Sequence, residues 1–309
     1  MKVLILNPVM QRDLHLYQSQ FDDAEVEVVC PPLKQFLTEE ELMPFMGQVD
    51  GVIAGDDEFT RMVMQAGLPR LKVISKWGVG LDSIDLQAAE DLGIPVFNSP
   101  GAFSVAVAEV AVGYMLMLSR HLSVVDRSVR NGGWPKPEGG GLAGKTLGIV
   151  GLGAIGRAVA DRARPFGMVV NAFDVNSDKM DPPDSGAFLS FEALCQTSDF
   201  LCLCCNLTDQ NHHLIDADSI ALMERRPFVI NVGRGPLIDE VALVEALMEK
   251  RIRGAALDVY EVEPLPESTP LKQLDSVILG SHNANNLASA NQYVNENTVG
   301  NLLRCLSQS

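Results

Sequence analysis

The sequence predicts an α/β protein built from two parallel-sheet domains, each with helices packed on its sheet. Strand-like and helix-like segments alternate along the whole chain, which is typical of parallel sheets. The 309 residues are too many for one ordinary core and suffice for two domains. With 47% apolar and 21% charged residues, the composition is that of an ordinary globular protein.

The first series of strands occupies the N-terminal third of the chain. Short apolar runs predict strands at Val3–Leu6, Val26–Val29, Gly51–Ala54, Leu71–Ser75 and Pro95–Phe97. Polar, helix-compatible stretches lie between these runs, for example at Thr38–Met46 and Leu86–Leu92.

A second series of apolar runs begins near the middle of the chain. It predicts strands at Thr146–Val150, Val169–Phe173, Asp199–Leu203, Phe228–Asn231, Ala255–Asp258 and Val277–Leu279. The segment Phe103–Arg120 is apolar on nearly all sides, as expected of a helix wedged between two domains. Apolar spacing predicts another helix at Leu287–Leu306. The glycine-rich stretch Gly132–Gly141 fits a linker and a surface loop equally well.

Charge and hydropathy argue against two classes of partner. The net charge of −16 repels phosphate backbones, so no nucleic acid is expected. The longest apolar run, Val105–Leu118, contains Glu109 and is shorter than the roughly 20 residues that a membrane helix needs. The segment Met1–Asn7 is too short for the core of a signal peptide. We therefore expect a cytoplasmic protein with no membrane partner.

The six cysteines show no spacing typical of a disulfide framework, which favours packing thiols in a reducing cytosol. The densest group, Cys202, Cys204 and Cys205, lies at the end of a predicted strand, where neighbouring side chains point to opposite faces. These thiols cannot all converge on one ion, so no metal site is predicted.

A glycine-rich turn joins the strand Thr146–Val150 to the helix-compatible segment Arg157–Phe166. Gly151 permits the tight turn, Gly153 lets the backbone approach a pyrophosphate, and Gly156 allows close packing of helix on strand. Free amides at the start of the helix favour negative charge. Tight turns also use glycine for structural reasons alone, so the motif gains weight only from its context.

That context is an acid at the end of the next strand. Val169–Phe173 ends at Asp174, eighteen residues after Gly156. An acid at this place accepts hydrogen bonds from the adenosine ribose hydroxyls and repels a 2′-phosphate. Neither Val175 nor Asn176 is basic. The sequence therefore predicts that the domain binds NAD rather than NADP.

Three separated segments carry groups suited to reducing a carbonyl. Arg234 follows the strand Phe228–Asn231, and its fork can hold a carboxylate through two parallel bonds; an ion-pairing or capping role fits this segment alone equally well. His282 follows Val277–Leu279, and its imidazole exchanges protons near neutral pH. Glu263 is the carboxylate expected to orient and stabilise that ring. The remaining histidines lack such a setting and are interpreted as surface or packing residues: His15, His121, His212 and His213.

Taken together, these segments resemble the D-isomer-specific 2-hydroxyacid dehydrogenase family, in its phosphoglycerate dehydrogenase-like branch. The resemblance runs from about residue 71 to residue 282. Several motifs occur in the family's order: Lys76–Asp85, Asn98–Gly101, Val107–Glu109, Gly151–Gly156, Asn231–Gly235, Asp258–Pro264 and His282.

The resemblance implies two Rossmann-like or flavodoxin-like domains with the active site in the cleft between them. Residues 1–100 and 285–309 would form a discontinuous substrate domain, and residues 101–284 an NAD-binding domain. Two copies of the chain would form a homodimer.

The resemblance also assigns roles to individual residues. Arg234 would grip the substrate carboxylate, His282 would exchange the proton, and Glu263 would be its partner. The amides of Val79 and Gly80 would complete the carboxylate site. Further residues would line the cofactor, Asp258 by holding the nicotinamide carboxamide, together with Ala154, Ile155, Asp174, Cys205, Val232 and Gly233.

The chain departs from the family pattern in two places. The family usually has proline before the histidine, where this chain has Ser281, and asparagines follow at positions 283, 285 and 286. These asparagines either bond to cofactor or substrate or cap the last helix. Cys204-Cys205-Asn206 replaces the usual residues after the third strand of the NAD domain.

The implied reaction is reversible hydride transfer between NAD(H) and a small 2-oxo or 2-hydroxy acid. Phosphoglycerate dehydrogenases often carry an arginine after the third strand of the substrate domain, whereas Gly55–Glu58 here is acidic and would repel a phosphate. Lys76 would compensate only partly, so reduction of glyoxylate or hydroxypyruvate is an alternative. An alternative of another class is an NAD-sensing binding protein, like the transcriptional corepressors that share this fold.

Overall fold

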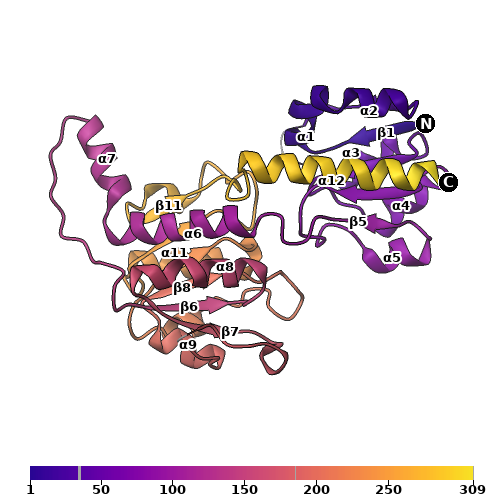
Figure 1. Cartoon of the computed structure of the whole chain (residues 1–309). Coiled ribbons are helices and arrows are strands. Elements are labelled where there is room, and N and C mark those ends of the chain that lie inside the picture. The colour runs from indigo at the N-terminus through magenta and orange to yellow at the C-terminus, as the bar shows by residue number, and fades with distance from the viewer. Residues whose placement is uncertain (34–35, 185, 309) are drawn as a thin grey trace. The chain divides into compact units, whose positions relative to one another are not determined.

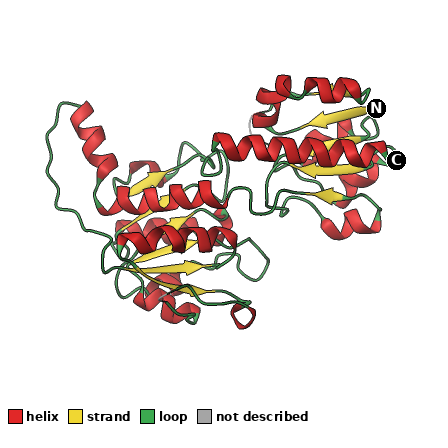
Figure 2. Cartoon of the chain, viewed as in Figure 1, coloured by secondary structure: helices red, strands yellow, loops and turns green. Residues whose placement is uncertain are grey.

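The computed structural model describes residues 1–33, 36–184 and 186–308. The chain divides into two compact units: Met1–Phe103 with Leu287–Ser309, and Ser104–Asn286. In each unit a parallel sheet lies between helices, as Figure 1 and Figure 2 show. The predicted fold class, two parallel-sheet α/β domains, is confirmed.

The sheet of the first unit has the strand order β2-β1-β3-β4-β5. Its strands are β1 (Lys2–Ile5), β2 (Glu27–Val29), β3 (Gly51–Ala54), β4 (Val73–Lys76) and β5 (Val96–Phe97). Because β1 pairs in parallel with both β2 and β3, the strand order reverses beside it. In open α/β sheets, ligands bind beyond the carboxyl ends of the strands at such a point.

The α-helices that accompany this sheet in the described residues are α1 (Pro8–Asp13), α2 (Gln18–Asp23), α3 (Glu39–Leu42), α4 (Arg61–Gly67), α5 (Leu86–Asp91) and α12 (Ala288–Ser307). The C-terminal helix α12 returns to the first unit and packs on β3 and β4, as its yellow ribbon shows in Figure 1. Val294, Val299 and Leu302 of α12 are fully buried, so this helix completes the core.

The predicted helix at Thr38–Met46 is split in two. Thr38 starts α3 with a capping box, in which its hydroxyl accepts from the Glu41 amide and the Glu41 carboxylate accepts from the Thr38 amide. The α-helix ends at Leu42, and a 3₁₀ turn follows at Met43–Phe45. Pro44 in that turn lacks the amide hydrogen that a continued α-helix would use.

The sheet of the second unit has six parallel strands in the order β11-β10-β9-β8-β6-β7. They are β6 (Thr146–Val150), β7 (Val169–Phe173), β8 (Phe200–Leu203), β9 (Phe228–Asn231), β10 (Gly254–Leu257) and β11 (Val277–Leu279). The strand order again reverses beside the first strand, because β6 lies between β7 and β8. The glycine-rich turn follows β6 and therefore stands at this switch point.

Helices cover both faces of this sheet: α6 (Ser104–Ser119), α8 (Ala154–Ala163), α9 (Phe191–Thr197), α10 (Ala217–Ala221) and α11 (Glu240–Met248). Helix α7 (Leu122–Arg130) follows α6 and has no buried residue. On one face α9, α10 and α11 share a buried apolar cluster with Leu201 and Leu203 of β8. On the other face α6 packs along α8 and against β9, β10 and β11. The apolar character of α6 thus reflects burial within the second unit.

Two further expectations are refined. Helix α8 begins at Ala154, three residues before the predicted Arg157–Phe166, because Gly153 already serves as its N-cap. The glycine-rich stretch Gly132–Gly141 lies within the second unit and is a surface loop rather than a linker between the units. Among the described residues no single helix passes a length and hydropathy test for a membrane span, although α6 and α7, bent by 68°, pass it jointly.

Candidate active site

The glycine-rich turn after β6 brings three chain segments into close contact. Gly151 has a φ of +89°, a conformation that favours glycine, and a Cβ there would lie 2.7 Å from main-chain atoms of Cys205. A Cβ at Gly156 would collide with the Gly151 carbonyl oxygen. At Gly153, in contrast, a Cβ would meet no atom within 4 Å. The fold itself requires Gly151 and Gly156, while Gly153 leaves space in front of helix α8.

Helix α8 starts in that space with Ala154 and Ile155. Its N-cap, Gly153, has no side chain that would occupy the first amides of the helix. Ala154 is exposed and Ile155 is half-buried. These amides, together with the positive end of the helix dipole, can therefore bind a phosphate.

Asp174 lies beside this turn at the end of β7. Its Oδ2 accepts a hydrogen bond from the Leu152 amide at 2.9 Å, and its Oδ1 accepts one from the Asn176 amide at 2.8 Å. The half-buried carboxylate is thus held at the switch point, where it can accept from ribose hydroxyls and repel a 2′-phosphate. The residues present fit the adenosine and pyrophosphate parts of NAD.

Cys205, Val232 and Gly233 follow the neighbouring strands β8 and β9. A Cβ at Gly233 would lie 2.8 Å from the Cys205 carbonyl oxygen, so the two loops touch. Burial raises the pKa of the Cys205 thiol to about 12. A neutral thiol is a poor nucleophile, and the predicted place of Cys205 beside the cofactor stays a prediction.

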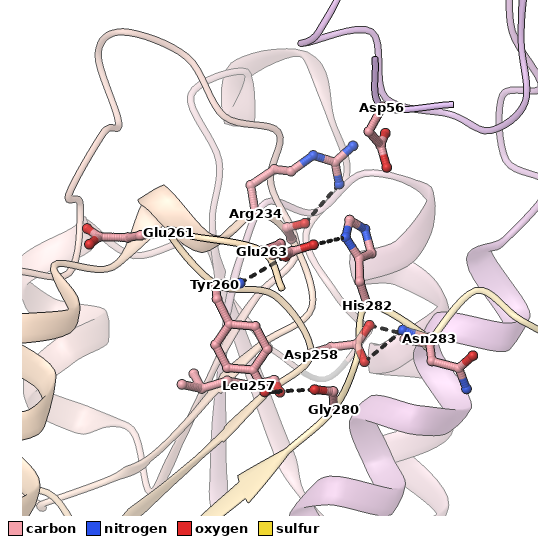
Figure 3. A network of polar contacts seen from close by, with 12 residues as sticks. Asp56, Arg234, Leu257, Asp258, Tyr260, Glu261, Glu263, Gly280, His282 and Asn283 are labelled. Atoms are coloured by element: carbon pink, nitrogen blue, oxygen red, sulfur yellow. Dashed lines mark hydrogen bonds and ion pairs between the residues drawn. The ribbon is translucent and has the colours of Figure 1, made fainter. Parts of the chain in front are cut away.

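Arg234 is presented by a loop that the side chain of Asn231 braces. The Asn231 Oδ1 accepts from the Gly233 amide at 3.0 Å, and its Nδ2 donates to the Arg234 carbonyl at 2.8 Å. The Arg234 Nη1 donates to the Gly233 carbonyl at 2.9 Å. In Figure 3 the Arg234 side chain extends past Glu263 on the same side as the His282 ring.

Glu263 and His282 form a hydrogen-bonded pair. The His282 Nδ1 lies 2.8 Å from the Glu263 Oε2, and both side chains are largely buried, 23% and 16% exposed. The other carboxylate oxygen of Glu263, Oε1, accepts from the Tyr260 amide at 3.0 Å, which fixes its orientation (Figure 3). Because Nδ1 bonds to the carboxylate, Nε2 is the ring nitrogen predicted to exchange a proton with a substrate.

Asp258 is buried at the carboxyl end of β10, only 3% exposed. Its carboxylate accepts from the Asn283 and Ala284 amides, immediately after His282. The contact predicted between Asp258 and a nicotinamide carboxamide stays a prediction.

Val79 and Gly80 lie in the first unit, in the loop after β4. The Asn98 Nδ2 donates to the Val79 carbonyl at 2.7 Å, and the Ser99 amide donates to the Gly78 carbonyl at 2.8 Å. Both residues are half-buried. Because the Gly78 and Val79 carbonyls are held by the neighbouring loop, the orientation of the peptide groups that carry the Val79 and Gly80 amides is defined.

Two expectations need correction. Lys76 does not stand as a cation ready for a phosphate: it is 3% exposed, and its Nζ donates to the Gly55 carbonyl and lies 2.6 Å from the Asp56 Oδ1. The ends of β3 and β4 are adjacent in the sheet, so lysine and acid meet. His213 also has a carboxylate setting, because its Nε2 lies 2.5 Å from the Glu261 Oε1.

Two tyrosines that support the site are not predicted from the sequence. The Tyr260 hydroxyl lies 3.0 Å from the Leu257 carbonyl oxygen and 2.8 Å from that of Gly280; it can donate its one hydrogen to either, and it links the ends of β10 and β11. Tyr114 donates to Asp258 from helix α6, 144 positions away in the chain. No local motif marks Tyr114, whereas Tyr260 lies inside the segment already singled out around Asp258 and Glu263.

Two of the asparagines after His282, Asn283 and Asn286, bond to each other. The Asn286 Nδ2 donates to the Asn283 Oδ1 at 2.8 Å, and the Asn286 amide donates to the Asn283 carbonyl at 3.0 Å. Helix α12 has Leu287 as its N-cap, with no side-chain capping bond. No asparagine is the N-cap residue of this helix, and the two roles considered for these side chains stay predictions.

Comparison with known proteins gives this geometry a context. Residues 112–284 match the family model described as D-isomer specific 2-hydroxyacid dehydrogenase, NAD binding domain. The chain is 39% identical over 286 residues to a D-3-phosphoglycerate dehydrogenase of Methanocaldococcus jannaschii, covering 91% of this chain but only 53% of that protein. It is 37% identical over 287 residues to a hydroxypyruvate reductase of Thermotoga maritima, covering 91% of this chain and 92% of the relative.

Among solved structures, the TT0316 protein from Thermus thermophilus superposes with a TM-score of 0.87 at 32% identity, covering 100% of this chain and 97% of the other. The family model covers more than half of the chain, and it coincides with the unit that carries the glycine turn, Asp174, Arg234 and the Glu263–His282 pair. The chain therefore belongs to the D-isomer-specific 2-hydroxyacid dehydrogenase family of NAD-dependent oxidoreductases.

Proposed function

We propose that this protein reversibly reduces a small 2-oxo acid that carries no phosphate, glyoxylate or hydroxypyruvate being the model substrates. The observation that carries the proposal is the Glu263–His282 pair, with its Nδ1–Oε2 distance of 2.8 Å, in the same unit as Arg234 and the glycine turn. Such a pair supplies the proton that a carbonyl oxygen needs when hydride reaches its carbon.

Each residue has a separate task in this proposal. NAD(H), when bound, supplies or accepts the hydride. Arg234 holds the substrate carboxylate by two parallel bonds, aided by the amides of Val79 and Gly80. His282 donates a proton to the carbonyl oxygen during reduction and accepts it during oxidation. Glu263 keeps the ring oriented and stabilises its protonated form.

The loop after β3 argues against a phosphorylated substrate. Asp56 and Glu58 are exposed in this loop. The cation expected to offset them, Lys76, is buried and ion-paired with Asp56. A phosphate approaching this loop would meet net negative charge, whereas a hydrogen atom or hydroxymethyl group carries no charge to repel. The chain spans only 53% of the phosphoglycerate dehydrogenase that it resembles, so that enzyme's substrate is a weaker guide.

A substrate panel tests the proposal directly. Initial rates of NADH oxidation would be measured with glyoxylate, hydroxypyruvate and phosphohydroxypyruvate at one ionic strength. We expect kcat/KM to be at least tenfold higher for one of the first two acids than for the phosphorylated one. A preference for phosphohydroxypyruvate would overturn the substrate assignment. No turnover with any 2-oxo acid, despite NADH binding, would instead favour an NAD-sensing binding protein.

We further propose that the protein is a homodimer formed through the α7 region. Helix α7 has no buried residue, although its hydrophobic and polar residues lie on different faces. Leu122 and Val129 of α7 are 49% and 42% exposed, and Trp134 in the following loop is 79% exposed. Figure 1 shows α7 and this loop reaching away from the body of the second unit. A second copy would cover these apolar side chains.

Light scattering tests this assembly. We expect the mass of a dimer for the unmodified protein and that of a monomer for Val129→Asp combined with Trp134→Ser. A monomeric unmodified protein would contradict the proposal.

We also propose a cytoplasmic location without nucleic acid or membrane partners, supported by the net charge of −16 and by six free cysteines. Cell fractionation with an activity assay tests that location.

A further inference from the structure

The backbone of His282 has a conformation that residues other than glycine rarely adopt. Its φ is +55°, in the left-handed region that residues other than glycine mostly avoid. Such a residue keeps this conformation only when its surroundings determine it. The bond between the ring and Glu263 fixes the side chain, so the backbone needs anchors of its own.

Asp258 supplies three such anchors. Its main-chain carbonyl accepts from the His282 amide at 2.7 Å. Its carboxylate accepts from the next two amides in the chain, that of Asn283 at 3.2 Å on Oδ1 and that of Ala284 at 2.9 Å on Oδ2. Figure 3 shows Asp258 directed at the backbone of Asn283. One buried acid thus holds three successive amides, beginning with that of His282.

Tyr114 in turn holds Asp258, in a space that Gly280 leaves open. The Tyr114 hydroxyl donates to the Asp258 Oδ1 at 3.3 Å. Burial, followed by the charge of Asp258, raises the pKa of Tyr114, so its hydroxyl stays a proton donor. A Cβ at Gly280 would come within 2.5 Å of the Tyr114 hydroxyl and closer still to the Asp258 Oδ1. Only glycine leaves room at position 280 for the tyrosine and the acid to meet.

We infer that Asp258 and Tyr114 are positioning residues for the reaction, which set the His282 ring by fixing its left-handed backbone. The inference rests on the proposed role of His282 as the proton donor. It gives Asp258 a task that does not require contact with a cofactor, and it gives Tyr114 and Gly280 an effect on turnover through His282 alone. Misplacing a reacting group by about 1 Å can cost as much as 100-fold in rate.

Gly280→Ala and Tyr114→Phe test the inference, because neither change alters a group proposed to touch substrate or cofactor. We expect Gly280→Ala to lower kcat about tenfold or more and Tyr114→Phe about two- to fivefold. The dissociation constant of NADH, measured by fluorescence, should stay within twofold in both variants. Gly113→Ala is the matched control: it lies on α6 beside Tyr114, its Cβ would meet nothing within 4 Å, and kcat should not change.

Repeating both changes in a His282→Ala background separates positioning from general damage. If Tyr114 and Gly280 act only through His282, neither change lowers the residual turnover of His282→Ala further. An equal loss in both backgrounds would overturn the inference, as would unchanged kcat in both single variants. Should Gly280→Ala fail to fold, Tyr114→Phe, which removes one oxygen atom, decides alone. If His282→Ala itself turned over normally, the proposed function would fall, which is a distinct result.

Discussion

The His282 Nδ1 lies 2.8 Å from the Glu263 Oε2, although the two residues are 19 positions apart and follow different strands. The contact forms because β10 and β11 are adjacent and parallel, so the loops at their carboxyl ends meet. This relationship fixes one nitrogen of the imidazole and orients the ring. The chemistry proposed for the protein depends on it.

Glu263→Gln should keep the shape of this pair and remove its charge. A neutral amide no longer favours the protonated imidazole, so the pH above which 2-oxo acid reduction declines should move down. Turnover at pH 7.5 should fall about tenfold. A pH profile of kcat/KM measures both effects. Glu261→Gln, the same change two positions away, should leave the profile in place, and a profile unmoved in Glu263→Gln would contradict the assignment.

In the variant Arg234→Lys, the lysine should not take over binding of the substrate carboxylate. A lysine ammonium keeps the charge but cannot form two parallel bonds to a carboxylate. We expect KM for the 2-oxo acid to rise about 10- to 100-fold and kcat to fall, with NADH binding unchanged. Steady-state kinetics measure this, with the surface change Arg225→Lys as the control. Normal substrate affinity in Arg234→Lys would show that another group holds the carboxylate.

Asp174→Ala should weaken the preference for NADH over NADPH. The variant loses both an acceptor for ribose hydroxyls and a charge that repels a 2′-phosphate. The ratio of kcat/KM for the two cofactors should fall about 100-fold, mostly through a higher KM for NADH. Asp178→Ala, in the following 3₁₀ turn at Ser177–Lys179, is the control. An unchanged ratio would place the ribose contact elsewhere.

Asp57 should make stability depend on pH in a direction opposite to that of most acids. Its fully buried carboxylate accepts the Leu37 amide at 2.7 Å and the Gly55 amide at 2.8 Å, yet burial still raises its pKa to about 6. Between about pH 4 and 6 the native state therefore holds more protons than the unfolded chain. The contribution of Asp57 to the free energy of unfolding is greatest below this window and falls as pH rises through it, by roughly 3 kcal/mol in total.

Urea unfolding at pH 4.5 and 7.5 measures this effect. Other acids titrate as well, so the useful quantity is the difference between the unmodified protein and Asp57→Asn. The asparagine has no charge to bury, so the variant should lose less stability than the unmodified protein on going from pH 4.5 to 7.5. Equal losses in both proteins would show that Asp57 remains ionised when buried.

Much of the fold followed from local patterns in the sequence. The strands Thr146–Val150, Val169–Phe173 and Phe228–Asn231 were predicted with the bounds that the structure has. Apolar runs of this length, bounded by turn residues, have few other stable arrangements. The glycine turn and Asp174 were predictable for the same reason, since both depend on residues that adjoin a strand.

The supports of the site were not predictable from local sequence. Tyr114 meets Asp258 across 144 positions, and Lys76 meets Asp56 because their strands are neighbours. Both contacts depend on the order of strands and helices in space, which cannot be derived from a short stretch of sequence. The left-handed backbone conformation of His282 was not predictable either, because in a sequence mainly glycine indicates that conformation.

Single-turnover kinetics of His282→Ala, with His213→Ala as a histidine that also has a carboxylate partner, test the central claim most directly. Mixing each protein with NADH and hydroxypyruvate should show hydride transfer slowed at least 100-fold in His282→Ala, with NADH affinity within twofold of normal. His213→Ala should be within twofold on both counts. Hydride transfer at the normal rate in His282→Ala would contradict the claim that this imidazole supplies the proton.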